Sequence, residues 1–416
     1  FDIVQTWFGC GNGWVEQDGQ LVPVHQTAEY KEAIDWLKKV YDDGLMSPDW
    51  VTIDTSEWSN GCKKGQNGVY IDVMDGGRRI WDYFVNNDVK SVTNPDEFAS
   101  MNLLGPINGK TLATSGYNGY YLITTDDFAV ALTIADNSYM GLDSISLLDF
   151  RIPWCHTKSP MSFMTLGKRN LPPSSDMGNV SSGNKKYSIE YKHNGDHRIL
   201  SFRMENFCDG KPLNGLIRLE CPETESMVIA TPFAEKDTAF YYNQKVNCMP
   251  VKGKVNFDGR DYIFDGRKDM AVLDWGRGVW TYDNIWRWGT CSTRLNGVPF
   301  GFNLGYGFSD RSSATENVIF YDGRAHKLQE VVFMIGQDDK GNFNYMDPWT
   351  ISSSDGRFEG IFEPILDRKA KIDMKVIASD QHQVFGHLTG TAVLDDGTEL
   401  KMRDVIAAIE VVHNRY

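Results

Sequence analysis

The chain has 416 residues, of which 42 are Lys or Arg and 56 are Asp or Glu, so its formal charge is −14. With 41% apolar and 24% charged residues, the composition is that of a folded protein and excludes a wholly disordered or collagen-like chain. The acidic balance argues against a general nucleic-acid binder, and no apolar run is long enough to span a membrane. At roughly 150 residues per domain, two or three domains are expected.

The first part of the chain, residues 1–125, mixes helical and strand patterns. After Thr27, a residue type favoured at helix N-caps, apolar residues recur at helical spacing through Tyr41. Gly44 is placed to end this helix, because glycine readily adopts the left-handed conformation at helix C-termini. The sequence therefore predicts an amphipathic helix between Thr27 and Gly44, within a mixed α/β segment.

The second part, residues 126–416, has a different sequence pattern. Short alternating or aromatic-rich runs are separated by dipeptides that accept the positive φ angles of tight hairpins. Long helical periodicity is hard to find, so we expect an all-β barrel or sandwich. No Pro-, Ser- or Gly-rich linker separates the two parts. The hairpin dipeptides are Asn194-Gly195, Asp258-Gly259, Asn296-Gly297, Asp322-Gly323, Asp355-Gly356 and Asp396-Gly397.

The seven cysteines do not form a recognisable framework. Their number is odd and none are spaced as C-x-x-C, which argues against a disulfide scaffold or a zinc site. We interpret them as core thiols of a protein in a reducing compartment.

Residues 1–125 resemble a segment of the extracellular solute-binding proteins of carbohydrate ABC importers. The resemblance covers only part of that family, whose members have two lobes, so the segment is truncated. It implies an extracellular location, an oligosaccharide ligand and a permease partner. The phrases that carry it are Phe8-Gly9 with Asn12 and Trp14, EYKEAIDWLKKVYDDGLMSPDW (29–50), GQNGVYIDV (65–73) and LLGPINGKTLATSGYNGYYLI (103–123).

Residues 128–416 resemble the domain-of-unknown-function family 2804, an uncharacterised bacterial and fungal group. The resemblance implies a lipocalin-like, two-barrel β fold similar to carotenoid hydratases, and a cytoplasmic location. The opening strands of that family are absent here, and the importer-like segment takes their place. The phrases that carry it are LTIADNSYMGLDS (132–144), TPFAEKDTAFYYNQKVNCMPVKG (231–253), LDWGRGVWTY (273–282), GFNLGYGFSDRSSATENVIFYDGRAHKL (301–328), PILDR (364–368), DQHQVFGHLTG (380–390) and the terminal HNRY.

The junction of two truncated families leaves two interpretations open. A barrel without its first strands exposes an unpaired edge, and half a lobe leaves an apolar face uncovered. The reading frame is either a chimera with no joint function or a true fusion in which the first part completes the second.

The phrase LDWGRGVWTY offers a carboxylate, a guanidinium and two indoles. Asp274 and Arg277 either pair over a turn, or Arg277 binds a carboxylate or polar ligand. Trp275 and Trp280 are candidates for lining a pocket or stacking on a sugar or polyene. Further along, Trp288 shares one strand face with Trp286, as core or as pocket wall.

The phrase around 301–320 offers Asn303, Glu316 and Asn317. Glu316 and Asn317 open an apolar strand, and a lone carboxylate in aromatic surroundings is a candidate general acid. The glycines at 301, 305 and 307 do not match a nucleotide-binding fingerprint, and no helix pattern follows them.

The phrases PILDR and DQHQVFG offer Asp367, Arg368, His382 and Gln383. His382 is a candidate general base or proton donor that Asp367 would orient. The alternative is a buried histidine beside a structural Asp–Arg pair. His382 and His387 lack metal-ligand spacing, and we expect neither a metal nor another cofactor.

We therefore predict a β-barrel protein that binds an apolar or amphipathic small molecule and hydrates, isomerises or hydrolyses it. Such reactions need an acid, a base and an aromatic pocket that excludes water. The predicted catalytic residues are Asp274, Glu316 and His382. The predicted ligand-binding residues are Trp275, Arg277, Trp280, Trp288, Asn303, Asn317, Asp367, Arg368 and Gln383. The alternatives are an extracellular carbohydrate-binding component of an ABC importer, with a permease as partner, and a scaffold without catalysis.

Overall fold

The structure is a computed structural model of the chain. It describes residues 2–53 apart from 11, 12, 18 and 51, and residues 115–415 apart from 170, 173, 174, 177, 313 and 374–377. The chain divides into two units, Phe1–Asp96 and Glu97–Tyr416. The phrase at 65–73 and the first part of the phrase at 103–123 lie outside the described residues.

The first unit contains the predicted helix, which is confirmed. The Thr27 hydroxyl accepts a hydrogen bond from the Tyr30 backbone N–H at 3.3 Å, and Gly44 has a φ of +73° just beyond the helix end. Ala33 and Leu37 are the buried residues of the helix. The described elements are α1 (Asp2–Thr6), β1 (Trp14–Gln17), β2 (Gln20–Pro23), the 3-10 turn η1 (Val24–Gln26) and α2 (Ala28–Asp42).

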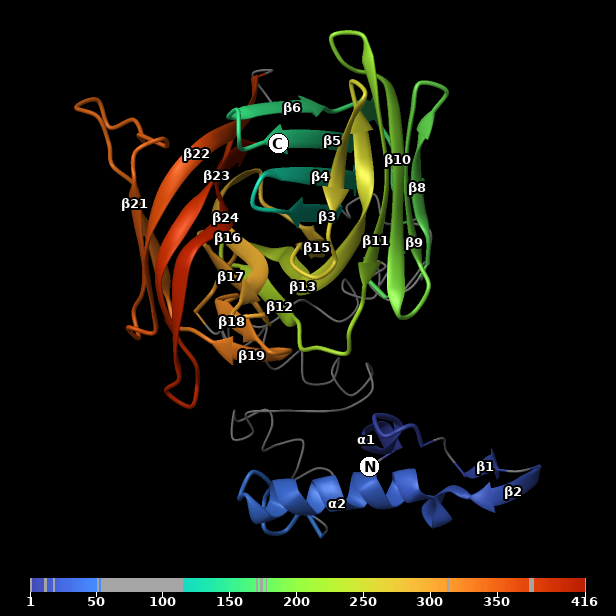
Figure 1. The fold of residues 1–416 in the computed structure, drawn as a ribbon. Helices are drawn as coiled ribbons and strands as arrows, with labels where there is room; N and C mark the ends of the chain where they lie inside the picture. The colour runs from blue at the N-terminus through green and yellow to red at the C-terminus, as the bar shows by residue number, and fades with distance from the viewer. Residues whose placement is uncertain are drawn as a thin grey trace. The chain divides into compact units, whose positions relative to one another are not determined.

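The second unit begins its described part with a large antiparallel sheet (Figure 1). Its main path runs β6-β5-β4-β3-β15-β13-β11-β10-β9-β8, while β12 and β14 pair with β13, and β7 pairs with β5. The strands are β3 (Ser115–Thr124), β4 (Phe128–Asp136), β5 (Met140–Asp149), β6 (Trp154–Lys158), β7 (Met161–Phe163), β8 (Val180–Asn184), β9 (Tyr187–His193), β10 (His197–Cys208), β11 (Lys211–Glu220), β12 (Met227–Phe233), β13 (Lys236–Phe257), β14 (Arg260–Phe264) and β15 (Met270–Val279).

A second antiparallel sheet follows in the same unit, in the order β19-β18-β17-β16-β24-β23-β22-β21-β20. Its strands are β16 (Asp283–Leu295), β17 (Val298–Tyr306), β18 (Val318–Tyr321), β19 (Arg324–Lys327), β20 (Val331–Met334), β21 (Trp349–Ser353), β22 (Phe358–Asp373), β23 (Ala378–Val393) and β24 (Glu399–Arg415).

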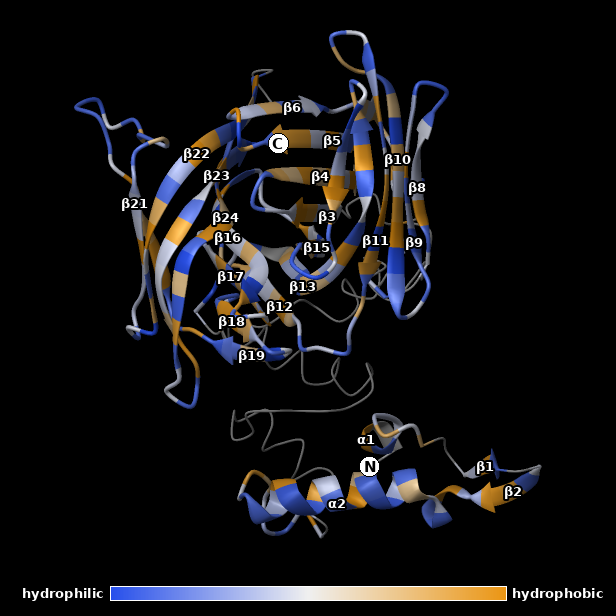
Figure 2. Ribbon diagram, in the orientation of Figure 1, coloured by the Kyte–Doolittle hydropathy of each residue, from blue (hydrophilic) through white to orange (hydrophobic). Residues whose placement is uncertain are grey.

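Each sheet curls around an apolar core of its own. Apolar and polar residues alternate along the long strands, so one face of each strand turns inward (Figure 2). On β10, for example, Leu200, Phe202 and Met204 face the first core. The second core is built around Phe302, Trp349 and other residues from β17 to β24. A mainly β fold with two curled sheets agrees with the predicted fold class.

A third apolar cluster packs the outer faces of the two sheets against each other. The first sheet contributes residues such as Leu122 and Val272, and the second contributes Leu366, Phe385 and Ile406. The two sheets are therefore joined by a buried layer that belongs to neither curled core.

The six predicted hairpin dipeptides are confirmed as turns between paired strands. The glycine of each has a positive φ, and Asp258, Asn296 and Asp322 adopt positive φ as well. These local signals therefore place strand ends well along the second unit.

The first described strand of the second unit lies before residue 125, where the sequence predicts a domain boundary. Strand β3, which precedes that position, pairs with both β4 and β15 inside the first sheet.

No helix in the described part of the chain is long and apolar enough to cross a membrane.

Candidate functional site between the two sheets

Charged and polar side chains occupy part of the layer between the sheets. On the first sheet, Tyr120, Asp274 and Lys245 are direct partners across β3, β15 and β13. On the second sheet, four residues are aligned across β22, β23, β24 and β16. Those four are Arg368, Gln383, Glu410 and Trp288. We call these seven residues the inter-sheet polar layer.

A chain of hydrogen bonds crosses this layer. The Tyr120 hydroxyl of the first sheet donates to Gln383 Oε1 at 3.1 Å, and Gln383 Nε2 donates to Glu410 Oε2 at 2.7 Å. The other carboxyl oxygen of Glu410 accepts from Trp286 Nε1 at 2.7 Å. Glu410 is only 6% exposed, so both of its oxygens are held by buried donors.

Asp274 lies in the same layer as half of an ion pair. Its carboxylate is 2.5 Å from Lys245 Nζ and accepts from Asn243 Nδ2 at 2.8 Å. Lys245 is 3% exposed, and its ammonium also lies over the Trp288 ring, 4.5 Å from the centroid. A buried ammonium needs such partners, because desolvation of an unpaired charge is costly.

Arg368 supplies the second cation of the layer. It donates to Ser146 Oγ at 2.9 Å, which ties β22 to the first sheet, and its guanidinium lies 5.8 Å from the centroid of the Tyr120 ring. Two cations and two carboxyl groups therefore lie in the same layer.

Burial controls protonation at the centre of this layer. Desolvation raises the pKa of Glu410, and the Asp274 charge raises it further, whereas the Trp286 hydrogen bond and the Arg368 charge lower it. Burial also raises the pKa of Tyr120 to about 12, so this phenol stays protonated at neutral pH. A buried carboxyl with a raised pKa in the same layer as an ion-paired carboxylate is suited to acid–base chemistry.

Glu316 connects to the layer through two other predicted residues. Trp288 Nε1 donates to Asn303 Oδ1 at 2.7 Å, and Asn303 Nδ2 donates to Glu316 Oε2 at 3.1 Å. A Cβ at position 305 would overlap the Glu316 carboxyl group, so Gly305 leaves the space that this side chain fills. Contacts thus run from Asp274 through Lys245, Trp288 and Asn303 to Glu316.

Asn317 has a different role from its neighbour. Its Oδ1 accepts from the Gly305 backbone N–H at 2.7 Å, and its Nδ2 donates to the Gln329 carbonyl at 2.8 Å. Asn317 therefore fastens β17 to the connection before β20 rather than reaching toward the inter-sheet polar layer.

His382 faces away from the inter-sheet polar layer. It precedes Gln383 on β23, and consecutive strand residues point to opposite faces. His382 Nδ1 lies 2.6 Å from Asp367 Oδ2, so the expected contact between these two residues is present. The imidazole also stacks on Tyr345 at 3.8 Å between centroids. The structure therefore joins Asp274 and Glu316 in one network and places His382 on the other face of the second sheet.

Trp275 and Arg277 of β15, and Trp280 just after its end, point away from Asp274 or lie beyond the strand. Trp275 is 2% exposed, belongs to the first core and lines a pocket there. Trp280 packs edge-on against Phe308, with ring centroids 5.7 Å apart. Arg277 is half-buried and is the strand partner of Tyr242.

Three residues of the site were not predicted from the sequence: Tyr120, Lys245 and Glu410. Glu410 carried a usable signal, because it is the lone charged residue in the apolar run 405–412. Lys245 and Tyr120 carried none, since their strands contain other lysines or tyrosines at similar spacing. Within the described residues, no group of three or more His, Cys, Asp or Glu is arranged to hold a metal ion.

Two of the solved structures that resemble this chain extend over most of its second unit. A kievitone hydratase from Nectria haematococca is 12% identical with a TM-score of 0.44, covering 73% of this chain and 89% of its own. A putative AttH protein from Nitrosomonas europaea is also 12% identical with a TM-score of 0.44, covering 71% of this chain and 90% of its own.

Comparison with characterised proteins finds two relatives from Bacillus subtilis (strain 168). Lipoprotein LipO is 32% identical over 123 residues, which are 30% of this chain and 24% of LipO. The polygalacturonan/rhamnogalacturonan-binding protein YtcQ is 23% identical over 126 residues, which are 29% of this chain and 23% of YtcQ. The chain thus spans about a quarter of the length of each relative.

The larger match covers most of the second unit and its inter-sheet polar layer. Residues 104–416 match the family model described as a domain of unknown function, DUF2804. The match and the importer-like range 1–125 overlap in the segment that leads into β3. The chain therefore belongs to the DUF2804 family.

Proposed function

We propose that this protein binds an apolar or amphipathic small molecule at the inter-sheet polar layer and hydrates, isomerises or hydrolyses it. The observation that carries the proposal is that Glu410, a buried carboxyl whose pKa is raised by desolvation, lies in the same layer as Asp274, an ion-paired carboxylate. Such reactions require an acid and a base whose surroundings give them different pKa values.

The proposed roles follow from the contacts of each group. Glu410 donates a proton to the bound molecule, and Asp274, held by Lys245 and Asn243, accepts one from water or substrate. Trp286 and Trp288 supply an apolar wall that excludes bulk water. The Asp274 side chain keeps 14% of its surface exposed, which leaves a route for solvent. Glu316 acts in support through Asn303, and His382 acts only on a molecule that reaches the other face of β23.

The test is turnover of a panel of apolar alkenes, enones and esters by the full chain in water enriched in both deuterium and oxygen-18. Hydration adds one heavy water to the substrate, hydrolysis places one heavy oxygen in a cleaved product, and isomerisation takes up only deuterium. Mass spectrometry of the products distinguishes the three. We expect Asp274→Asn and Glu410→Gln each to lower the rate by about 100-fold or more.

One control and two further variants test whether the loss of turnover belongs to the inter-sheet polar layer. Asp261→Asn removes a carboxylate that pairs with Lys254 and Asn256 near the surface, and is expected to leave turnover unchanged. Glu316→Gln and His382→Asn test the other predicted catalytic residues. A loss confined to His382→Asn would move the reaction to the opposite face of the second sheet, and no turnover of any compound class would contradict catalysis.

A second candidate function, carbohydrate binding, is favoured by the first unit. The likeness to YtcQ and the partly exposed side chains of Trp7, Trp14, Trp36 and Trp50 support it, since indoles commonly stack on sugars. As an importer component, the protein would deliver its ligand to a permease. A thermal-shift screen with oligogalacturonides tests this, because a ligand of the native state must raise stability.

A third proposal is that the reading frame is a chimera with no joint function. The overlap of two partial family resemblances supports it. Long-read sequencing of the source DNA across codons 100 to 150 tests it, and a continuous, well-covered junction would contradict a chimera.

A further inference from the structure

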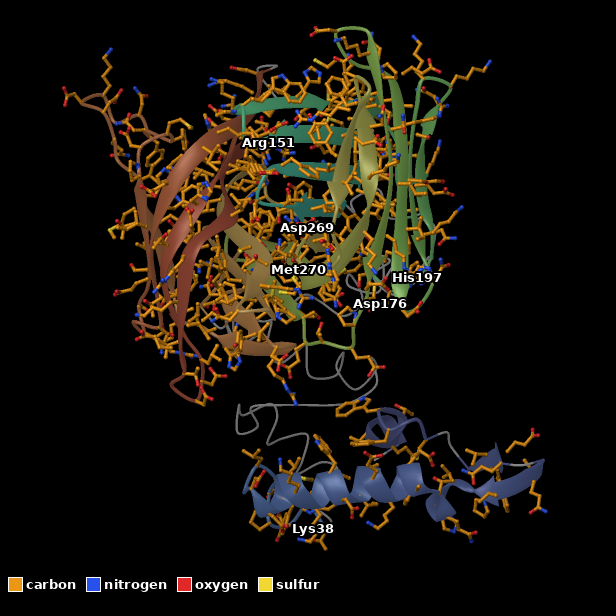
Figure 3. The ribbon with its side chains drawn as sticks, in the orientation of Figure 1. Lys38, Arg151, Asp176, His197, Asp269 and Met270 are labelled. Atoms are coloured by element: carbon orange, nitrogen blue, oxygen red, sulfur yellow. The ribbon has the colours of Figure 1, made fainter. Side chains whose placement is uncertain are left out.

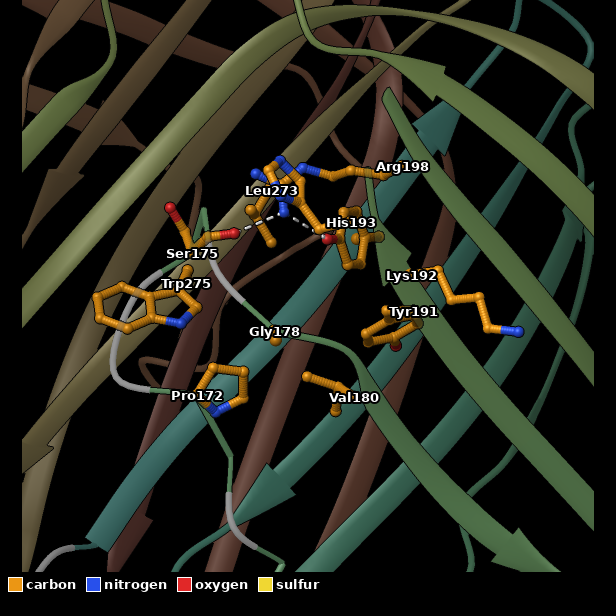
Figure 4. A pocket seen from close by; sticks show the side chains of 12 residues that line it. Pro172, Ser175, Gly178, Val180, Tyr191, Lys192, His193, Arg198, Leu273 and Trp275 are labelled. Atoms are coloured by element: carbon orange, nitrogen blue, oxygen red, sulfur yellow. Dashed lines mark hydrogen bonds between the residues drawn. The ribbon is translucent and has the colours of Figure 1, made fainter. Parts of the chain in front are cut away.

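A pocket inside the first curled sheet has a lining unlike that of the inter-sheet polar layer (Figure 4). It encloses about 360 Å³ when the space open to solvent at its mouth is included. One wall is aromatic and apolar: the Tyr121 and Tyr191 rings meet edge to face at 4.8 Å, and Leu273, Trp275 and Val180 line the same space. Such a wall offers apolar contact to part of a ligand held at the pocket mouth.

A buried cation lines the same pocket. Arg198 on β10 is 5% exposed, and its Nη1 donates to the Ser175 carbonyl at 2.7 Å and to the Tyr121 hydroxyl at 3.4 Å. Figure 4 shows Arg198 beside Ser175 on the lining of this pocket. Its Nε has no hydrogen-bond acceptor within the described part of the chain. The guanidinium is thus fixed in position, and one of its donors is buried without an acceptor.

The charge of Arg198 is weakly balanced. Its carboxylate partner is Asp176, 3.2 Å away, whose side chain is 65% exposed. The Cys221 thiol also lies near, and the Arg198 charge lowers the thiol pKa while burial raises it. A buried guanidinium whose counter-ion is mostly in water can accept a second anion, and a charge-assisted hydrogen bond is strong in such surroundings.

We propose that this pocket binds a small amphipathic anion, with a carboxylate on Arg198 and an aromatic or alicyclic body against Tyr121, Tyr191 and Trp275. Because a buried guanidinium lines the pocket, the ligand is expected to carry a negative charge. The site is separate from the inter-sheet polar layer, because Trp275 and Asp274 point to opposite faces of β15. The proposal stands whether or not that layer is catalytic.

The test is calorimetric titration of the full chain with 2-naphthoate and with its neutral isostere, 2-naphthamide. The two probes share one apolar body and differ in the group that would meet Arg198. We expect the carboxylate to bind at least about 10-fold more tightly than the amide. Trp275→Ala is expected to weaken both probes alike, because it removes part of the shared apolar wall.

Three variants locate the anion. Arg198→Gln is expected to lower naphthoate affinity to that of the amide, whereas Arg203→Gln is expected to change neither. Arg203 lies on the same strand but its side chain is 48% exposed, so it repeats the charge change outside the pocket. Asp176→Asn alters an exposed side chain, spares the fold and is expected to tighten naphthoate binding by removing the competing carboxylate.

Four outcomes would overturn the proposal. They are equal affinity for the two probes, no binding of either, equal losses in Arg198→Gln and Arg203→Gln, or unchanged naphthoate binding in Asp176→Asn. Should Arg198→Gln fail to fold, the comparison of the two probes on the native chain and on Asp176→Asn still decides the question.

Discussion

At the scale of single residues, several buried carboxyl groups in this protein carry a cost that depends on pH. Asp269, beside Met270 at the start of β15, is 4% exposed (Figure 3). Its Oδ2 accepts from the Asp265 backbone N–H at 2.6 Å. Burial raises the pKa of Asp269 to about 6. The folded state therefore binds a proton more tightly than the unfolded state does.

The sign of the effect follows from linkage. The folded pKa of Asp269 lies above the unfolded one, so proton binding stabilises the folded state. This contribution is complete below about pH 4 and is lost as pH rises through about 6. Asp269→Asn keeps an acceptor for the Asp265 N–H and removes the charge. We expect it to raise the free energy of unfolding at pH 7.5 by up to about 3 kcal/mol, and by much less at pH 4.5. Urea unfolding at both pH values measures this.

The matched control is Asp339→Asn, which makes the same charge change at an exposed loop position. It is expected to move the free energy of unfolding by less than about 0.5 kcal/mol. Equal effects of Asp269→Asn at the two pH values would contradict the assignment.

At the scale of elements, β13 is the strand that bends the first sheet. Its first half pairs with β12 and β15, and its second half pairs with β11 and β14. The register shifts between Val246 and Met249, and Cys248 has a φ of +61°. A bulge of this kind sharpens twist and lets one long strand serve two ladders.

Gly253 permits the second ladder. Its φ is +137°, and a Cβ there would overlap the Leu216 carbonyl oxygen of β11. Gly253→Ala is therefore expected to cost about 2–4 kcal/mol through strain and lost strand pairing. Gly336→Ala is the control, because a Cβ at that position meets nothing within 4 Å. Urea unfolding compares the two, and equal stability would show that β13 shifts without penalty.

At the scale of the second unit, the layer between the sheets makes their folding cooperative. Phe385 is fully buried in this layer and packs against Phe150 of the first sheet, with centroids 5.6 Å apart. Phe385→Ala is expected to cost about 3–5 kcal/mol and to lower amide protection in both sheets. Hydrogen exchange read by mass spectrometry measures this, with the exposed Ile361→Ala as control. Lost protection confined to the second sheet would mean that the sheets unfold separately.

The sequence by itself determined the features that depend on near neighbours along the chain. The helix after Thr27, the six hairpin turns and the alternation that curls each sheet follow from capping, positive φ and side-chain periodicity. Asp274, Arg368 and Gln383 are predicted as site residues because they lie in phrases that carry the family resemblance. The roles of these residues remain proposals until variants are measured.

Only the tertiary structure decided which of these side chains meet. The Tyr120–Gln383 hydrogen bond joins positions 263 residues apart, and no local pattern marks a partner at that distance. In the structure, His382 and Gln383 lie on opposite faces of β23, and Lys245 forms an ion pair with Asp274. Strand register and sheet packing set these contacts. A strand sequence specifies which face is buried, but the facing sheet specifies what that face contacts.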